Sequence, residues 1–285
     1  MKTIKKLVLA IIATLCIAPS LIAQNSLLYK VEGDNIKTSY VFGTMHMMPK
    51  EDFLLEEKVK NAFTASDLVV MELDMDDPSM QAEMMKYVML GVEESLEDHM
   101  TPEEYKILDD YLTTKMGVGM AAFSKMKPFI ISSTVMIAHL GQDMASFEAT
   151  FLQMAAAEKK EVKGLETIEF QMSMFDEQSY EQQIDQVIEM LQKEGGMGTY
   201  FDEIVSAYTS QDIDVLYKVL NEFFEDDKAF KKKMLDDRNE NWIPKIGENS
   251  KENSVFYAVG AGHLGGEKGV VSLLKASGYR VTPVE

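Results

Sequence analysis

Short hydrophobic runs alternate with longer amphipathic segments along most of this chain. Runs bounded by Gly, Asp, Asn or Ser are typical of buried strands, and apolar positions three and four residues apart are typical of helices. Strands that alternate with helices indicate an α/β fold with a mainly parallel sheet, which here begins with an N-terminal β-hairpin. The predicted strands are 27–31, 39–42, 67–73, 161–166, 255–259 and 279–284, and the predicted helices are 56–65, 148–160 and 267–276.

Two long segments interrupt this alternation. Residues 79–141 and 178–246 are mostly helical by the same criteria, and Thr101 and Glu104 have the spacing of a capping box. We expect two large helical inserts that pack over one face of the sheet, inside a single domain spanning residues 24–285. The many methionines of these helices are expected to serve in packing rather than as a binding surface.

The first 23 residues have the features of a cleaved signal peptide. Three lysines precede an apolar run over residues 7–17, and small residues before Gln24 offer a cleavage site. The run is too short to span a bilayer comfortably, so we expect a periplasmic or secreted protein with no stable membrane span. Lipid attachment at Cys16 is the alternative. Cys16 is the only cysteine, so the mature chain has no thiol for metal binding, catalysis or a disulfide.

Acidic residues outnumber basic ones throughout the chain. Removal of the three leader lysines takes the formal charge from −19 to −22. Such a surface repels nucleic acid backbones and anionic lipids, so no nucleic-acid partner is expected. The composition leaves the oligomeric state open.

Two segments near opposite ends of the chain share one design, a strand followed by Gly-x-x-His. The first ends in His46 and the second in His263. A glycine just after a buried strand lets the backbone turn sharply, so that the next side chains face the crevice at the strand's carboxyl end. We therefore expect the two imidazoles to lie within about 8 Å of each other, close enough to share one ion or one substrate.

Two further strands end in carboxylates. Glu72, with Asp74 two residues later, closes the strand at 67–73, and Glu166 closes the strand at 161–166. Because the carboxyl ends of parallel strands lie at one edge of a sheet, these groups are expected to meet the two histidines. Two imidazoles with one or two carboxylates suit Mn, Zn, Co or Fe. A bound metal lowers the pKa of water, and a non-ligating carboxylate could then act as general base.

The remaining candidates have plainer interpretations. His99 and His139 are expected to be hydrogen-bonded structural residues. Arg238 is a surface ion-pair residue or, if it is directed into the crevice, a group that holds a substrate carboxylate or a developing oxyanion. The glycines of 260–265 match the dinucleotide-binding pattern, but the chain lacks the continuing βαβ unit and the acidic residue that this pattern needs.

The motifs of this chain resemble those of the TraB/GumN family. The resemblance covers nearly all of the mature chain and implies a fold shared with the haem-binding ChaN-like and erythromycin-esterase-like proteins. It also implies kinship with the TIKI proteins, which are Mn- or Co-dependent peptidases. The matching residues are 40–46, 71–74, 164–167, Gln171, 238–239, 259–264 and 278–281.

The site implied by this resemblance consists of His46, Glu72 and His263, with Glu166 and Arg238 beside them. The implied cofactor is a divalent metal, with Mn or Co favoured and Zn or Fe possible. No departure from the family pattern is visible in the two histidine motifs.

Two functions compete for this site. The first is an exported metal-dependent hydrolase that cuts a peptide or amide bond in a peptide or small protein. In that case His46 and His263 bind the metal, Glu72 is a ligand or the general base, and Arg238 stabilises the oxyanion. The second is a non-catalytic protein that binds a peptide, haem or iron in the same crevice.

These assignments make a prediction about stability. A ligand in an open crevice is not a packing residue, so alanine at His46 or His263 should remove metal and cost little fold stability. Alanine at His139 should do the reverse.

Overall fold

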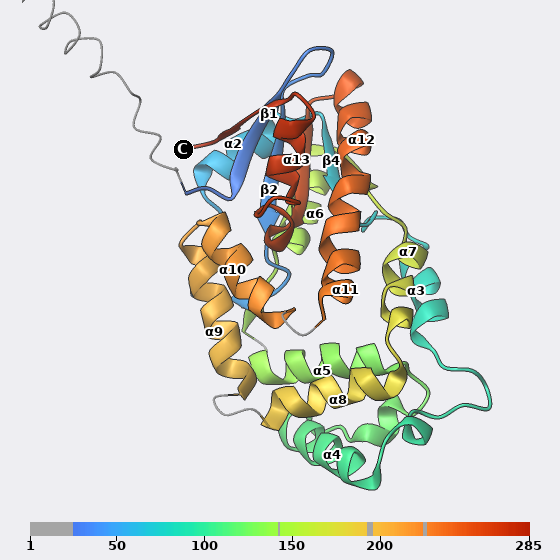
Figure 1. The fold of residues 1–285 in the computed structure, drawn as a ribbon. Coiled ribbons are helices and arrows are strands. Elements are labelled where there is room, and N and C mark those ends of the chain that lie inside the picture. Colours follow the sequence, from blue (N-terminus) through green and yellow to red (C-terminus); the bar gives the residue numbers. More distant parts are fainter. Residues whose placement is uncertain (1–24, 142, 193–195, 225–226) are drawn as a thin grey trace, which may run out of the picture.

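The structure is a computed structural model that describes residues 25–141, 143–192, 196–224 and 227–285 (Figure 1). The predicted signal peptide and Cys16 lie outside these residues. No helix within the described ranges is long and apolar enough to cross a membrane.

A six-stranded sheet forms the centre of the fold. Its strands are β1 (Leu28–Glu32), β2 (Ser39–Thr44), β4 (Leu68–Met71), β6 (Glu161–Gly164), β7 (Val255–Gly260) and β8 (Arg280–Pro283). They lie in the order β6-β4-β7-β2-β1-β8, and β6, β4, β7 and β2 run parallel to one another. β1 is antiparallel to both β2 and β8, which confirms the N-terminal hairpin. The predicted α/β fold with a mainly parallel sheet is therefore confirmed.

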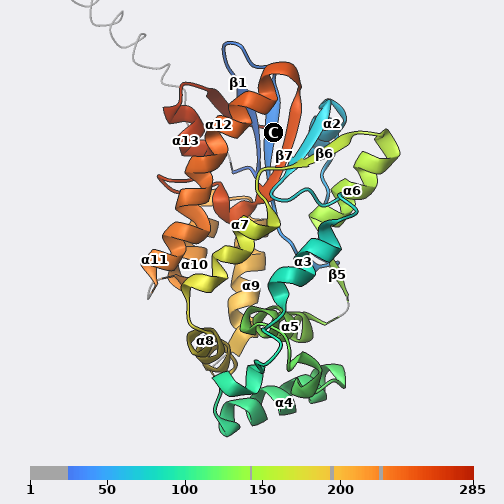
Figure 2. The same cartoon turned by 90° about the vertical axis from the view of Figure 1, so that its right-hand side faces the viewer.

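Helices cover both faces of this sheet and give three layers (Figures 1 and 2). α12 (Asp237–Glu252) and α13 (Val270–Ala276) lie on one face, and α2 (Glu57–Thr64) and α6 (Phe147–Glu158) lie on the other. Because both faces are covered, the central strands are apolar without alternation, and all four residues of β4 are buried.

Aromatic side chains fill the space between the sheet and α6. Phe42 of β2 lies 5.3 Å from Phe147 and 5.7 Å from Phe151, measured between ring centroids. Phe151 in turn lies 5.0 Å from Phe256 of β7. These edge-on contacts join α6 firmly to the strands that carry both histidine motifs.

The two predicted inserts are helical. Their helices are α3 (Met80–Val88), α4 (Pro102–Met116), α5 (Pro128–Leu140), α8 (Tyr180–Gln192), α9 (Gly196–Thr209), α10 (Ile213–Phe223) and α11 (Lys228–Lys231). α7 (Ile168–Ser173) lies between the two inserts, after β6. A π-helical turn, Lys232–Asp236, joins α11 to α12. The capping box of Thr101 and Glu104 begins α4 as predicted.

The inserts do not both cover a face of the sheet, so that expectation is wrong. α4, α5 and α8 lie beyond the carboxyl edge of the parallel strands (Figures 1 and 2). They bury their apolar stripes against one another in a separate core that includes Leu108, Val135 and Val187. α9 and α10 lie nearer the sheet, where Tyr208 and Leu216 join its hydrophobic core. The apolar stripes could be read from the sequence, but their partners could not.

Candidate functional site

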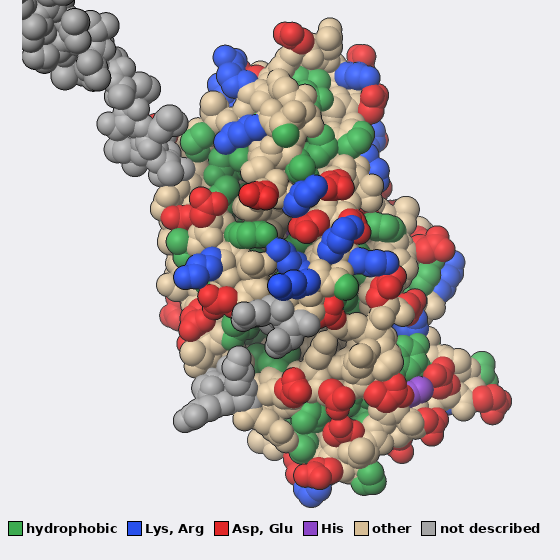
Figure 3. All heavy atoms as spheres, in the orientation of Figure 1, with side chains coloured by type: hydrophobic (Ala, Val, Ile, Leu, Met, Phe, Trp, Pro, Cys, Tyr) green, Lys and Arg blue, Asp and Glu red, His purple; other side chains and the backbone are tan. Residues whose placement is uncertain are grey.

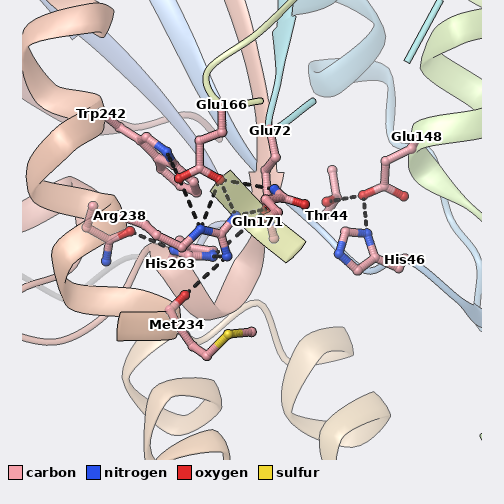
Figure 4. A network of polar contacts seen from close by, with 12 residues as sticks. Thr44, His46, Glu72, Glu148, Glu166, Gln171, Met234, Arg238, Trp242 and His263 are labelled. Carbon is pink, nitrogen blue, oxygen red and sulfur yellow. Dashed lines mark hydrogen bonds and ion pairs between the residues drawn. The ribbon is translucent and has the colours of Figure 1, made fainter. Parts of the chain in front are cut away.

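The parallel strands bring four predicted residues to one edge of the sheet. The ladder pairs the last residue of β2 with the last residue of β7, and the last residue of β4 with the last residue of β6. His46, Glu72, Glu166 and His263 follow these strand ends within three residues. They therefore emerge together at the carboxyl edge, facing the helices that lie beyond it (Figure 4).

The glycines of the two histidine motifs provide space. A Cβ atom on Gly43 would come within 2.6 Å of Leu264 and 2.9 Å of Ala261, and one on Gly260 would come within 3.2 Å of Glu72 Oε1. Neither glycine is among the described residues with positive φ. The sharp turn expected from the sequence is thus not the reason for these glycines. Gly43 makes room for the second motif, and Gly260 makes room for the Glu72 carboxylate.

Arg238 is the centre of the polar network at this edge. Its Nε donates to both oxygens of Glu166, at 3.1 and 3.0 Å, and its Nη2 donates to Glu72 Oε2 at 2.5 Å and to Glu166 Oε2 at 2.8 Å. Its Nη1 donates to the Met234 carbonyl at 3.1 Å and to His263 Nε2 at 3.2 Å. The side chain is 6% exposed. Arg238 is directed into the site, and the surface alternative raised by the sequence is wrong.

Glu166 is held on several sides. Besides Arg238, it accepts hydrogen bonds from Trp242 Nε1 at 2.8 Å and from Gln171 Nε2 at 3.0 Å. Gln171 also donates to Glu72 at 3.3 Å. With its side chain 2% exposed and both oxygens engaged, Glu166 acts in this structure as an anchor for Arg238.

Glu72 is ionised at neutral pH. Burial opposes its ionisation, but the neighbouring His263 and Arg238 lower the pKa of this carboxyl to about 2. Because His263 is neutral near pH 7, Arg238 and the protonated His46 are the cations that remain. Glu72 Oε1 accepts from the backbone N–H of Gly260 at 2.8 Å and lies 3.8 Å from His263 Nε2.

His263 is enclosed by protein. Its side chain is 6% exposed, and its ring lies 4.4 Å from that of Trp242. Since Arg238 donates to Nε2, the proton of the neutral ring is on Nδ1, which lies 2.7 Å from Asn239 Oδ1. Burial lowers the pKa of His263 to about 3. His263 is therefore a neutral imidazole with its Nε2 lone pair directed into the site.

His46 has the opposite surroundings. Its side chain is 71% exposed, and its Nδ1 lies 2.9 Å from Glu148 Oε1. This hydrogen bond raises the pKa of His46 to about 9, against some desolvation by the crevice walls. Glu148 is buried on α6 and also accepts from Thr44 at 2.5 Å and from Ser146 at 3.0 Å (Figure 4).

Sequence reasoning missed Glu148 and Trp242. Glu148 was placed at the start of a helix, with no role in the site. It lies on the apolar stripe that Phe151 and Ala155 continue at helical spacing. An acid on a buried stripe needs a partner, and this signal could have identified it. Trp242, the only tryptophan, gave no comparable signal.

Three other candidates lie outside the network. His99 lies between Glu94 and Glu181 at 2.9 Å from each, and His139 lies 3.4 Å from the hydroxyl of Tyr111. Both are hydrogen-bonded, as expected for structural residues. Asp74 has Asp76 and Asp77 as its acidic neighbours, and burial together with these aspartates raises its pKa to about 6.

The donor set matches part of what a divalent metal requires. In both histidines Nδ1 contacts an oxygen acceptor, Glu148 or Asn239, so Nε2 is the nitrogen that could coordinate an ion, an arrangement common in metal sites. His46, whose pKa is raised to about 9, must first lose a proton. Glu72 Oε1, 3.8 Å from His263 Nε2, can share an ion with it. Across the described residues, however, no three His, Cys, Asp or Glu side chains are gathered as an ion would need, and Arg238 already contacts two of the donors.

The fold and this edge define an α/β protein whose paired Gly-x-x-His motifs, two glutamates and one arginine form a single polar site. The model of the TraB/PrgY/gumN family matches residues 27–283, and the chain belongs to this family. Searches among curated proteins and among solved structures returned no match.

Proposed function

We propose that this protein is an exported, metal-dependent hydrolase of peptide or amide bonds. The observation that supports the proposal is that His46, Glu72 and His263 follow neighbouring parallel strands at one sheet edge, with Nδ1 of each imidazole in contact with an oxygen acceptor. Membership of the TraB/PrgY/gumN family supports the choice of site.

His46, Glu72 and His263 would hold the metal, for which Mn or Co is favoured and Zn or Fe is possible. The ion would supply a Lewis acid and a bound water of lowered pKa. Asn239 and Glu148 orient the imidazoles, and Glu166 anchors Arg238, so Glu166 becomes a supporting residue rather than a ligand. Glu72 is ionised at neutral pH, as either a ligand or a general base must be.

The second candidate is a non-catalytic protein that binds a peptide, haem or iron in the same crevice. One observation favours it: every N–H of Arg238 already has an acceptor, so the guanidinium has no free donor for an oxyanion in this structure. A binding protein needs no N–H donor for an oxyanion, whereas the hydrolase needs one N–H of Arg238 to leave its present acceptor.

The test uses protein without a histidine tag, purified after cleavage of its leader. Elemental analysis before and after loading with Mn²⁺ measures occupancy, and mass spectrometry of a random decapeptide mixture detects cleavage. The hydrolase hypothesis expects bound Mn and new peptide termini, both lost in His263→Ala. Bound Mn without cleavage favours the binding protein, and cleavage that survives in His263→Ala contradicts the site.

The exported location rests on the leader alone. Cell fractionation of the full chain, with N-terminal sequencing of the product, tests it. A product that retains residue 1 in the cytoplasm contradicts the proposal.

A further inference from the structure

Arg238 contacts two of the side chains that would bind a metal. Its Nη2 donates to Glu72 Oε2 at 2.5 Å, and its Nη1 donates to the Nε2 lone pair of His263 at 3.2 Å. The Nδ1 proton of His263 is directed to Asn239, so Nε2 is the only lone pair of this ring available in the site. A lone pair that accepts from a guanidinium cannot coordinate an ion at the same time.

Charge reinforces this exclusion. The guanidinium is permanently positive, and it is enclosed with Glu72 and Glu166, whose side chains are 14% and 2% exposed. A divalent cation bound to Glu72 and His263 would lie next to this buried positive charge, where screening by water is weak. The two cations therefore compete for Glu72 and for the Nε2 lone pair of His263.

The guanidinium has a second attachment that an ion would leave intact. Its Nε donates to Glu166, and the guanidinium carbon lies 5.0 Å from the centroid of the Trp242 ring. Glu166 is itself fixed by Trp242 Nε1. Arg238 can thus lose its contacts with Glu72 and His263 and remain attached at Nε.

We propose that Arg238 is a competing cation that lowers the metal affinity of this site and is displaced when an ion binds. The inference rests on the proposed function and deepens it. Displacement would free one N–H on Nη1 and one on Nη2, while Nη1 keeps the Met234 carbonyl and both Nη2 and Nε keep Glu166. The freed N–H groups could then donate to a substrate carbonyl oxygen, a role that the resting contacts withhold.

The test measures Mn²⁺ binding by the decrease of the free-ion EPR signal during titration of untagged protein. The variants are Arg238→Gln, Arg238→Lys and, as a matched control, Arg280→Gln. Arg280 is the only other arginine and makes an exposed ion pair with Glu32. We expect the Mn dissociation constant of Arg238→Gln to fall at least about 10-fold, and that of Arg280→Gln to stay unchanged.

Arg238→Lys is the more conservative variant, to be used if Arg238→Gln does not fold. A lysine retains one positive charge beside Glu166 but cannot donate to Glu166, Glu72 and His263 together, so its affinity for Mn should lie between those of the wild type and Arg238→Gln. A dissociation constant that rises or stays the same in both variants overturns the inference, because Arg238 would then support the ligands rather than compete with them.

His263→Ala separates this failure from failure of the proposed function. If wild-type protein binds Mn and His263→Ala does not, the metal site stands, whatever Arg238 does. If neither the wild type nor Arg238→Gln binds Mn, the metal site and the competition fail together. Binding that appears only in Arg238→Gln and is lost again in the double variant with His263→Ala is the strongest support for competition.

Discussion

His46 and His263 occupy the same position of the same local motif, yet they have opposite surroundings. His263 is 6% exposed, lies against Trp242, and has its pKa lowered by burial to about 3. His46 is 71% exposed, and its contact with Glu148 raises its pKa to about 9. The motif brings each ring to the sheet edge, but the neighbours decide its charge.

The difference arises from what packs beside each strand end. His263 follows β7, which is central in the sheet and is covered by α12 with its Arg238, Asn239 and Trp242. His46 follows β2, and its imidazole contacts the buried Glu148 at the start of α6. His263 is thus a fixed neutral imidazole, and His46 is a solvent-exposed ring held by the Glu148 carboxylate.

The largest expected effect is on metal binding. If both rings are ligands despite their different surroundings, His46→Ala and His263→Ala should each weaken Mn binding by more than about 100-fold, beyond the 10–100-fold typical of residues that only orient ligands. Isothermal titration with Mn²⁺ measures this, with His139→Ala as the control that keeps full affinity. A His46→Ala protein with unchanged affinity would show that only the buried histidine is a ligand.

Glu72 is the carboxylate that lies beside His263 at this edge. As general base, Glu72→Gln should lower the hydrolysis rate on the order of 10²-fold with Mn still bound, because the amide keeps the shape but cannot accept the proton. As ligand, it should weaken Mn binding, and excess Mn should restore part of the rate. Full rate together with full affinity excludes Glu72 from both roles.

Glu148 and Asn239 hold Nδ1 of the two histidines, and the loss of either should affect Mn affinity. Glu148→Ala and Asn239→Ala should each reduce Mn affinity about 10–100-fold, because the freed ring can rotate or move its proton to Nε2. Glu148→Gln retains an acceptor and should recover part of the loss. If Glu148→Gln is as weak as Glu148→Ala, the charge of Glu148 matters more than the orientation it gives His46.

Alanine substitutions at the two histidines should have clearly different effects on the free energy of unfolding. His263→Ala leaves a cavity beside Trp242 and unpaired partners on Arg238 and Asn239, so a loss of about 2–4 kcal/mol in the free energy of unfolding is expected. The sequence-based expectation of little cost is therefore kept only for His46→Ala: the ring is 71% exposed, and Thr44 and Ser146 still donate to the buried Glu148, so about 1 kcal/mol should be lost. Urea denaturation at pH 7 measures both, and equal losses would contradict the comparison.

The smallest effect is on the pH dependence of folding stability, and it has opposite signs for His263 and His46. His263 has a folded pKa of about 3, below its usual 6.5, so the unfolded chain gains its proton first and stability falls as pH drops from 6.5 toward 3. At pH 5 this amounts to about 1–2 kcal/mol. His46, with a folded pKa of about 9, contributes fully below pH 6.5 and loses its contribution as pH rises through 9.

Urea titrations at several pH values check these signs. His263→Asn should flatten the decline between pH 6.5 and 5, and His46→Asn should flatten a weaker decline between pH 7 and 9. A wild-type protein that gains stability as pH falls from 6.5 to 5 contradicts the buried neutral state of His263.

Local sequence was sufficient for the strands, their mainly parallel order and the common edge at which His46, Glu72, Glu166 and His263 emerge. Apolar runs are buried on both faces in a parallel sheet, and parallel strands share one carboxyl edge, so these features follow from short-range pattern. The helical inserts show what local sequence could not predict. α4, α5 and α8 were recognised as helices, but their pairing with one another beyond the sheet edge depends on shape complementarity between distant segments.

The sequence by itself therefore determined which residues reach the site, because strand ends and glycines act within a few residues. Only the tertiary structure decided the charge and the protonation state of each of these residues. Glu148 is 102 residues from His46, and Arg238 is 166 residues from Glu72. Charge and protonation depend on burial and on such distant partners, and no local motif encodes either of them.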